Sequence, residues 1–175
     1  MIELVPNRRP PLRVLFLCTG NSARSQMAEA VLERKGRDRY VVASAGASPA
    51  AQVHPLALRV LRERGIDWSG RRPKGIEAVR DQPWDLVITV CDRTKEECPA
   101  LPENPVFAHW GIPDPAAVNG TEEQRLHAFR DALTYLGRRI DLMLALPVEK
   151  VGQRASELRL ETGQSIGGDP PEPRR

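Results

Sequence analysis

Short apolar runs alternate along this chain with segments in which apolar residues recur every three or four positions. Four of the runs predict buried strands, at 13–19, 40–45, 85–90 and 106–110. Helical spacing follows the first run to about Lys35, begins again at His54-Pro55, and marks a long helix from Thr121 to Pro147. Strands that alternate with helices indicate an α/β fold, a single domain with a four-stranded parallel sheet flanked by helices on both faces.

The flanking segments lack this pattern. Residues 1–12 hold three prolines and two arginines and are expected to form a lead-in, so that the domain covers 13–147. From 148 to 175 Gly, Pro and charged residues dominate, which predicts a flexible C-terminal extension. Between the second helix and the third strand, residues 68–82 are polar and predict at most one short helix.

Composition narrows the function classes. The chain has 175 residues, 41% of them hydrophobic, and no apolar run approaches the ~20 residues that a membrane helix needs. The first dozen residues lack the apolar stretch of a signal peptide, so we expect a cytoplasmic protein without a membrane partner. The net charge is +3, but the arginines are scattered without an aromatic stripe, and we expect no nucleic-acid partner and a monomer. Three cysteines in such a chain are candidates for reactive thiols or metal ligands rather than structural disulfides.

The first strand leads directly into Cys18-Thr-Gly-Asn-Ser-Ala-Arg-Ser25. A five-residue loop between a cysteine and an arginine can curl around a tetrahedral oxyanion, because backbone N–H groups before a helix point inward and favour an anion. The expected oxyanion-binding residues are Thr19, Gly20, Asn21, Ser22, Ala23 and Arg24. Arg24 adds a planar fork that matches two oxygens.

Cys18 lies at the expected floor of this loop. There its thiol pKa can move from ~8.5 into the range ~3.5–7.5, which would make it a nucleophile near neutral pH. Ser25 supplies a hydroxyl beside the thiolate. The alternative is an ordinary strand-to-helix turn with a buried cysteine, but Met27, Ala28 and Val31 continue at helical spacing and favour the anion loop.

The strand order also predicts which residues meet. In parallel sheets ligands bind at the carboxyl ends of the strands. Cys18 follows the first strand, Cys91 the third, and Asp114 lies in the loop after the fourth, so we expect all three at one crevice. Asp114 can act there as a general acid or base, although a turn aspartate between two prolines is an equally good interpretation.

Cys91 and Cys98 flank six residues, and three interpretations are open. They are two unrelated thiols, a zinc site completed by His109, or a redox relay with Cys18. The spacing is wider than in common zinc knuckles, whereas a polar segment of this length can bring two Cα atoms to the ~4.4–6.8 Å of a disulfide. Two thiols beside an activated third favour the relay.

Three further residues supply oxygens around the anion loop, the first helix and the end of the second strand. They are Asn21, Glu29 and Ser44. Hydrogen bonds that hold the loop are one explanation of this set, and coordination of a monovalent cation is the other. No cofactor is required in either case.

With these residues assembled, the chain resembles the thioredoxin-coupled arsenate reductases, which share the low-molecular-weight protein tyrosine phosphatase fold. The resemblance runs from about Arg13 to Leu146. Its most specific parts are LCTGNSARSQMAEA, the SAG turn at Ser44 to Gly46, VCDRTKEEC and HWGIPDPA. The loop alone indicates the wider superfamily, whereas the added cysteine pair and Gln26-Met27 indicate the reductase branch.

The resemblance implies a role for each matching position. Cys18 matches the nucleophile, Arg24 the oxyanion binder, Ser25 the residue that stabilises the thiolate, and Asp114 the acid/base of the superfamily. Cys91 and Cys98 match the second and third redox cysteines. Asn21, Glu29 and Ser44 coincide with potassium-binding positions of some members. Arsenate would be reduced to arsenite by a three-cysteine relay, and thioredoxin would reduce the final disulfide, as in arsenic detoxification.

The chain departs from the family pattern twice. Ala23 stands where many relatives have a further cysteine, and the tail after Val151 extends beyond the usual domain. Three rival functions stay open. One is a phosphatase for phosphotyrosine or small phosphoesters, which needs only Cys18, Arg24 and Asp114. Another is a reductase that ends in a small-thiol mixed disulfide and does not need Cys98. The third is a non-enzymatic oxyanion or redox sensor.

Overall fold

The computed structural model describes residues 10–92, 101–102, 105–147 and 150. Its strands are β1 (Leu12–Cys18), β2 (Tyr40–Gly46), β3 (Leu86–Thr89) and β4 (Val106–His109). They form one parallel sheet in the order β2-β1-β3-β4. The expected four-stranded parallel sheet is therefore confirmed. Cys98, most of the lead-in and nearly all of the C-terminal extension lie outside the described residues.

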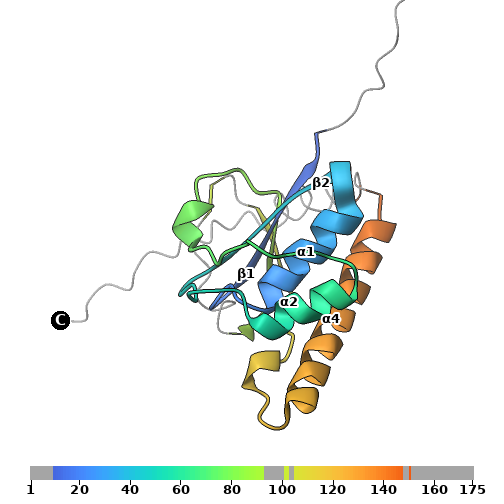
Figure 1. Ribbon diagram of the computed structural model, residues 1–175. Coiled ribbons are helices and arrows are strands. Elements are labelled where there is room, and N and C mark those ends of the chain that lie inside the picture. The colour runs from blue at the N-terminus through green and yellow to red at the C-terminus, as the bar shows by residue number, and fades with distance from the viewer. Residues whose placement is uncertain (1–9, 93–100, 103–104, 148–149, 151–175) are drawn as a thin grey trace, which may run out of the picture.

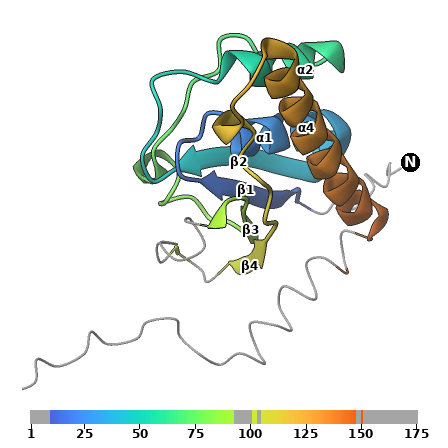
Figure 2. The same cartoon turned by 90° about the horizontal axis from the view of Figure 1, so that it is seen from below.

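Helical segments flank both faces of this sheet. Helices α1 (Arg24–Gly36), α2 (Pro55–Glu63) and α4 (Glu122–Ala145) lie together on one face, as Figures 1 and 2 show. On the opposite face lie the 3-10 helix η2 (Ile76–Ala78) and the segment after it. Two further 3-10 helices, η1 (Arg37–Arg39) and η3 (Pro115–Ala117), sit in connections.

Strand β1 is apolar throughout because it is covered on both faces. Val14 and Phe16 face the helix side, whereas Leu15 and Leu17 join Trp84 in the cluster on the other side. The four strand residues are completely inaccessible to solvent. A strand buried on both faces has no polar side to alternate with, which explains the continuous apolar run in the sequence.

The helix ends follow the local signals. His54 caps α2 through its Nδ1 atom, which accepts from the Leu56 N–H, and Gly65 follows the helix with φ of +71°. Thr121 and Gln124 form a capping box at the start of α4. The apolar face of α4 is buried and consists of Leu126, Phe129, Leu133, Leu136, Ile140 and Met143. These caps satisfy backbone groups that would otherwise lack partners.

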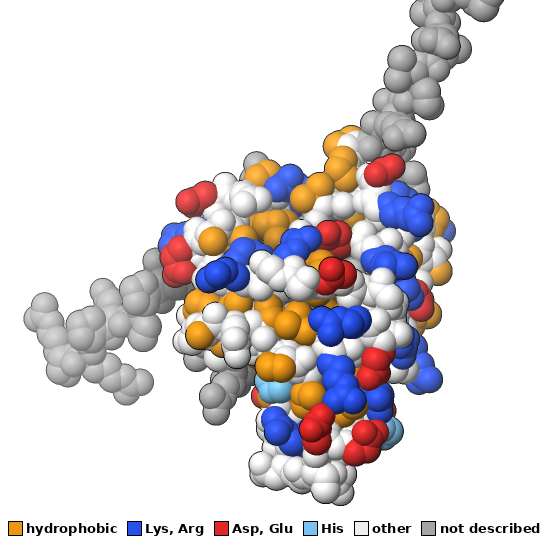
Figure 3. All heavy atoms as spheres, in the orientation of Figure 1, with side chains coloured by type: hydrophobic (Ala, Val, Ile, Leu, Met, Phe, Trp, Pro, Cys, Tyr) orange, Lys and Arg blue, Asp and Glu red, His pale blue; other side chains and the backbone are white. Residues whose placement is uncertain are grey.

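The surface carries both signs of charge. On the face in Figure 3, basic and acidic side chains are interspersed over the helices. Within the described part of the chain, every helix is too short or too polar to cross a lipid bilayer.

Parallel pairing brings the carboxyl ends of β1, β3 and β4 to one edge of the sheet. The loops that begin at Cys18, Val90 and Trp110 leave from this edge. Leu17 is paired with Thr89, and Thr89 with His109, so the three loops start at the same level. The expected convergence is a direct consequence of the strand order.

Candidate active site

The loop between β1 and α1 turns its carbonyl groups outward. The carbonyl oxygens of Cys18, Thr19, Gly20 and Ser22 accept hydrogen bonds from backbone N–H groups of the neighbouring segment 47–54. Asn21 has φ of +47°, a left-handed conformation that turns the chain sharply. Its own N–H points inward, to the Cys18 Sγ atom at 3.1 Å. This arrangement leaves inward-facing donors before the N-terminus of α1, as an oxyanion site requires.

Gly46, at the end of β2, lets the loop approach the sheet closely. A Cβ atom at this position would lie 2.5 Å from the Thr19 carbonyl oxygen and 2.9 Å from the Asn21 backbone nitrogen. Both distances are far below van der Waals contact, and both neighbours are backbone atoms that cannot rotate away. The glycine therefore holds the loop in its shape by leaving room for it.

The Cys18 thiol is buried, with 4% of the residue exposed. The Ser25 Oγ atom lies 2.9 Å from its sulfur. Burial raises the pKa of the Cys18 thiol above its ordinary value, because a thiolate loses its hydration there. Hydrogen bonds from Ser25 and from the Asn21 N–H act in the lowering direction. The expected lowering of this pKa is therefore wrong for this structure, and desolvation is the reason.

Arg24 and Asp114 lie together, as the strand order predicts. The Arg24 Nη2 atom is 3.3 Å from Asp114 Oδ2, and its Nη1 atom donates to the Ile112 carbonyl oxygen at 2.8 Å. Asp114 also caps η3, since its Oδ1 atom accepts from the Ala116 N–H. Both interpretations of this aspartate thus have a structural basis, and its carboxylate faces the arginine of the anion loop.

Cys91 lies at the same edge of the sheet as Cys18. It follows β3 and is 4% exposed. The Thr19 hydroxyl, one residue after Cys18, lies 3.5 Å from the Cys91 sulfur. A negative charge on the Cys91 sulfur raises the pKa of Cys18, so the two thiols are electrostatically coupled. Cys98, the third predicted thiol, lies outside the described residues.

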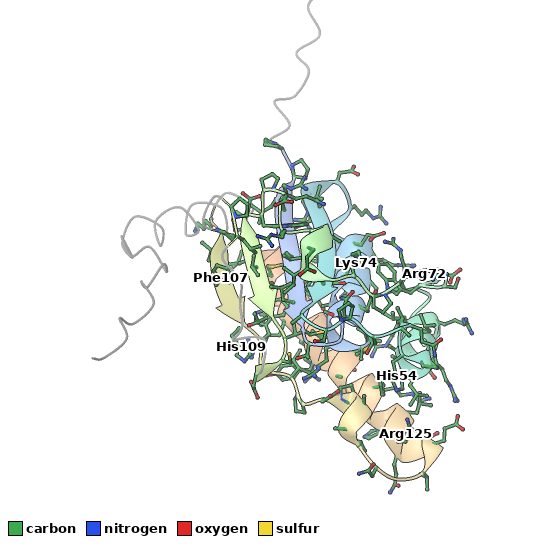
Figure 4. The ribbon with its side chains drawn as sticks, turned by 90° about the vertical axis from the view of Figure 1, so that its left-hand side faces the viewer. His54, Arg72, Lys74, Phe107, His109 and Arg125 are labelled. Atoms are coloured by element: carbon green, nitrogen blue, oxygen red, sulfur yellow. The ribbon has the colours of Figure 1, made fainter. Side chains whose placement is uncertain are left out.

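His109 contacts a threonine and an aspartate, and Cys98, the other residue of the zinc interpretation besides Cys91, lies outside the described residues. Its Nδ1 atom lies 2.8 Å from Thr89 Oγ1, and its Nε2 atom 3.0 Å from Asp92 Oδ1. Among the residues that the structure describes, no three His, Cys, Asp or Glu side chains are grouped as metal ligands. Figure 4 shows His109 on the β4 side of the sheet and Lys74 on the side of β2.

The Asn21 side chain is the centre of a buried hydrogen-bond network. Its Nδ2 atom donates to Ser25 Oγ at 2.9 Å and to Ser44 Oγ at 2.8 Å. Its Oδ1 atom accepts from the Lys74 backbone N–H at 2.7 Å and from Gln26 Nε2 at 3.0 Å. Since a backbone N–H can only donate, the orientation of the amide is determined. Asn21 therefore presents its N–H groups, not its oxygen, to Ser44.

Ser44 in turn donates to the Glu29 carboxylate, which is 2% exposed. The Lys74 Nζ atom lies 3.6 Å from Glu29 Oε2, and the Arg71 Nη1 atom 3.7 Å from Oε1. Burial raises the pKa of Glu29, while Ser44, Lys74 and Arg71 oppose that rise. Of the two sequence interpretations of Asn21, Glu29 and Ser44, the structure favours hydrogen bonds. A potassium ion fits this set poorly, because Asn21 offers it a donor and two cationic side chains already face Glu29.

Sequence reasoning missed Lys74, Arg71 and the Gln26 side chain, which also accepts from Trp68 Nε1. The first two lie in the polar segment 68–82, which gave no periodic pattern. One signal was available. Glu29 sits on the apolar face of the first helix, and a buried carboxylate needs a cationic partner somewhere in the chain.

The comparisons with known proteins agree with this geometry. The family described as low molecular weight phosphotyrosine protein phosphatase matches residues 13–151. An arsenate reductase of Halalkalibacterium halodurans is 42% identical over 127 residues, which cover 73% of this chain and 91% of the relative.

Two solved structures add to this. A structure described as an arsenate reductase in the phosphate binding state superposes with a TM-score of 0.63 at 31% identity, covering 77% of this chain and 97% of that one. A thioredoxin-dependent arsenate reductase of Corynebacterium glutamicum gives a TM-score of 0.52 at 31% identity. It matches 77% of this chain, which spans 64% of that protein.

Proposed function

The chain belongs to the low molecular weight phosphotyrosine protein phosphatase family, and from this premise we propose that it reduces arsenate to arsenite. One observation carries the proposal within this family. A second cysteine, Cys91, is buried beside the anion loop and contacts the Thr19 hydroxyl next to Cys18. A phosphatase has no use for a second thiol at this place, whereas reduction needs two.

Binding uses the anion loop and Arg24. Arsenate and phosphate share shape and charge, so either dianion fits inward-facing N–H groups before α1 and the guanidinium fork. Arg24 is already oriented over the loop by the Ile112 carbonyl oxygen and Asp114. A relative described as an arsenate reductase in the phosphate binding state supports the binding of an oxyanion.

The first chemical step joins sulfur to arsenic. The Cys18 sulfur attacks arsenic, and the hydroxyl that leaves takes the thiol proton with it as water. Asp114 delivers this proton, because its carboxylate faces Arg24 at the mouth of the loop. The hydrogen bonds from Ser25 and from the Asn21 N–H favour the thiolate that forms against its desolvation.

The second step reduces arsenic. The Cys91 thiolate attacks the Cys18 sulfur, the S–S bond forms and the S–As bond breaks with its electron pair left on arsenic. Arsenic(V) becomes arsenic(III), and the two thiols are oxidised to one disulfide. Cys98 then attacks the Cys91 sulfur and releases Cys18 as a thiolate. The resulting Cys91–Cys98 disulfide is reduced by the dithiol of thioredoxin in the cytoplasm, and the cycle needs one copy of the chain and no resident cofactor.

A single-turnover experiment tests the relay. The Cys98→Ser variant should release one arsenite per chain and stop with Cys18 and Cys91 joined, as mass mapping would show. The Cys91→Ser variant should release none. If Cys98→Ser cycles normally with a small thiol as reductant, the reaction ends in a mixed disulfide and the internal relay is wrong.

The phosphatase remains the second candidate, because Cys18, Arg24 and Asp114 suffice for it. Against phosphotyrosine as the main substrate, the loop around Asp114 contains no tyrosine to sandwich an aromatic ring. Turnover of arsenate with thioredoxin, compared with turnover of p-nitrophenyl phosphate without it, separates the two activities. Oxyanion binding without turnover of either substrate would indicate a sensor.

A further inference from the structure

The Glu29 carboxyl group is enclosed by the protein, one hydrogen bond away from the loop network. Its side chain is 3% exposed, and Ser44 Oγ donates to it. The same Ser44 oxygen accepts from Asn21 Nδ2, and the Asn21 backbone donates to the Cys18 sulfur. A carboxylate enclosed in this way costs several kcal/mol unless a cation accompanies it. Whatever cation stands at Glu29 therefore acts on the loop through Ser44 and Asn21.

Lys74 meets this network twice. Its Nζ atom lies 3.6 Å from Glu29 Oε2, and its backbone N–H donates to Asn21 Oδ1 at 2.7 Å. Its carbonyl oxygen accepts from the Gly46 N–H at 2.9 Å, which fixes the segment to the end of β2. Figure 4 shows Lys74 on this side of the sheet. One residue thus holds the Asn21 amide by its backbone and the buried carboxylate by its side chain.

Arg71 is a weaker candidate for the same task. Its Nη1 atom is 3.7 Å from Glu29, but its Nη2 atom donates to Glu33 at 2.9 Å and its guanidinium stacks over Trp68 at 4.1 Å. These contacts direct the arginine to the surface pair with Glu33. They leave Lys74 as the cation whose position is tied to the loop.

We propose that the Lys74 ammonium is a built-in monovalent cation that positions Asn21, and with it the Cys18 loop, through Glu29 and Ser44. Lys74 is a positioning residue and touches neither substrate nor sulfur. The proposal rests on the proposed function only for the identity of the oxyanion. It predicts that the wild-type protein needs no added potassium, and that removal of the ammonium creates a need for it.

The test compares Lys74→Met with the wild type in potassium chloride and in tetramethylammonium chloride at equal ionic strength. Tetramethylammonium is too large for a cavity left by an ammonium group. Phosphate affinity and the alkylation rate of Cys18 are the readouts, and neither depends on arsenate turnover. In tetramethylammonium we expect K74M to lose on the order of tenfold in both, since a displaced loop misplaces its donors. Potassium should restore most of the loss, and wild type should be equal in the two salts.

Three further variants make the result specific. Lys74→Arg keeps a cation and should behave as wild type. The double variant Glu29→Gln/Lys74→Met has no buried anion and should respond equally to both salts. Lys35→Met removes a surface ammonium paired with Asp141 and should show no salt effect. Circular dichroism in each salt reports folding, and a K74M protein that folds only in potassium also supports the proposal.

The proposal is overturned if K74M matches wild type in tetramethylammonium, if potassium does not restore its loss, or if wild type itself is stimulated by potassium. Failure of the proposed function looks different. In that case arsenate is not turned over by the wild type in any salt, while the salt dependence of phosphate binding by K74M is still observed.

Discussion

Arg24 and Asp114, ninety positions apart in the chain, form an ion pair with Nη2 3.3 Å from Oδ2. The arginine begins α1 directly after the anion loop, and the aspartate follows β4. The pair therefore joins the group that binds the oxyanion to the group proposed to protonate its leaving oxygen. The Ile112 carbonyl oxygen holds the same guanidinium from the other nitrogen, so Arg24 stays oriented when Asp114 changes its charge.

The Asp114→Asn variant should lose arsenate turnover by about 10²- to 10⁴-fold, the range that a general acid contributes. Phosphate affinity should stay within about threefold of wild type, because Arg24 keeps its contact with Ile112. Steady-state turnover and phosphate titration measure the two quantities. Asp81→Asn, an exposed aspartate on the surface, is the control and should change neither. If Asp114→Asn and Asp81→Asn turn over arsenate at the same rate, Asp114 is not the general acid.

Ser25 lowers the cost of the Cys18 thiolate, and its removal should be visible in the thiol chemistry. Burial raises the pKa of Cys18 and the Ser25 hydrogen bond opposes this, so Ser25→Ala should raise the pKa further. Less thiolate is then present at neutral pH, and each unit of added pKa slows alkylation about tenfold. Iodoacetamide kinetics against pH, in a background with Cys91 and Cys98 changed to serine, report Cys18 alone. Ser69→Ala is the control, and an alkylation profile that matches it contradicts the role of Ser25.

Thr19 contacts the second cysteine, not the first. Its hydroxyl lies 3.5 Å from the Cys91 sulfur, so it can hydrogen-bond the thiolate that attacks Cys18. Thr19→Val should slow formation of the Cys18–Cys91 disulfide about tenfold, as the loss of a hydrogen bond to a charged group predicts. Alkylation of Cys18 before arsenate is added should not change. Rapid-quench mass mapping separates the steps, and Thr134→Val on α4 serves as control. The prediction is contradicted if Thr19→Val slows the attack of Cys18 on arsenic and leaves the rate of Cys18–Cys91 disulfide formation unchanged.

The strands and the anion loop could be predicted from the sequence because local patterns encode them. An apolar run such as 13–19 predicts a buried strand, and the spacing of Cys18 and Arg24 predicts the anion loop. The meeting of Cys18, Cys91 and Asp114 at one edge also followed, since the carboxyl ends of parallel strands share a side. Each of these inferences needs only spacing along the chain and one rule about sheets.

The rest depends on burial and on partners distant in sequence. The pKa direction of Cys18 was wrong because the loop donors were weighed without the desolvation of a sulfur that is 4% exposed. Lys74 was missed because it is 45 positions from Glu29, in a segment without periodic pattern. The choice between an ion and a hydrogen-bond network at Asn21 required the orientation of its amide, which the Lys74 backbone N–H determines.

Gly46 should tolerate no side chain without damage to the site. In Gly46→Ala the new methyl would lie 2.5 Å from the Thr19 carbonyl oxygen, so the loop must move. We expect destabilisation of about 1–3 kcal/mol, typical of overpacking, and at least a tenfold loss of phosphate affinity. Gly137→Ala is the matched control, because nothing lies within 4 Å of a Cβ there and the residue is in α4. Alanine should stabilise that helix by about 0.5–1 kcal/mol. Urea unfolding and phosphate titration measure both.

The pH dependence of stability should reveal Glu29. Burial raises its pKa in the folded state above the unfolded value, so between the two values the folded protein holds more protons. The stabilisation that Glu29 contributes to the folded state is complete below the ordinary glutamate pKa. It is lost as the pH rises through the pKa that Glu29 has in the folded protein. The free energy of unfolding of wild type minus that of Glu29→Gln should therefore fall with rising pH. Glu63→Gln should give the opposite sign, because the hydrogen bond from Arg130 lowers the pKa of Glu63. Urea titrations of the three proteins from acid to neutral pH measure both differences. If the difference for Glu29→Gln rises instead, Lys74 and Arg71 outweigh burial at this carboxylate.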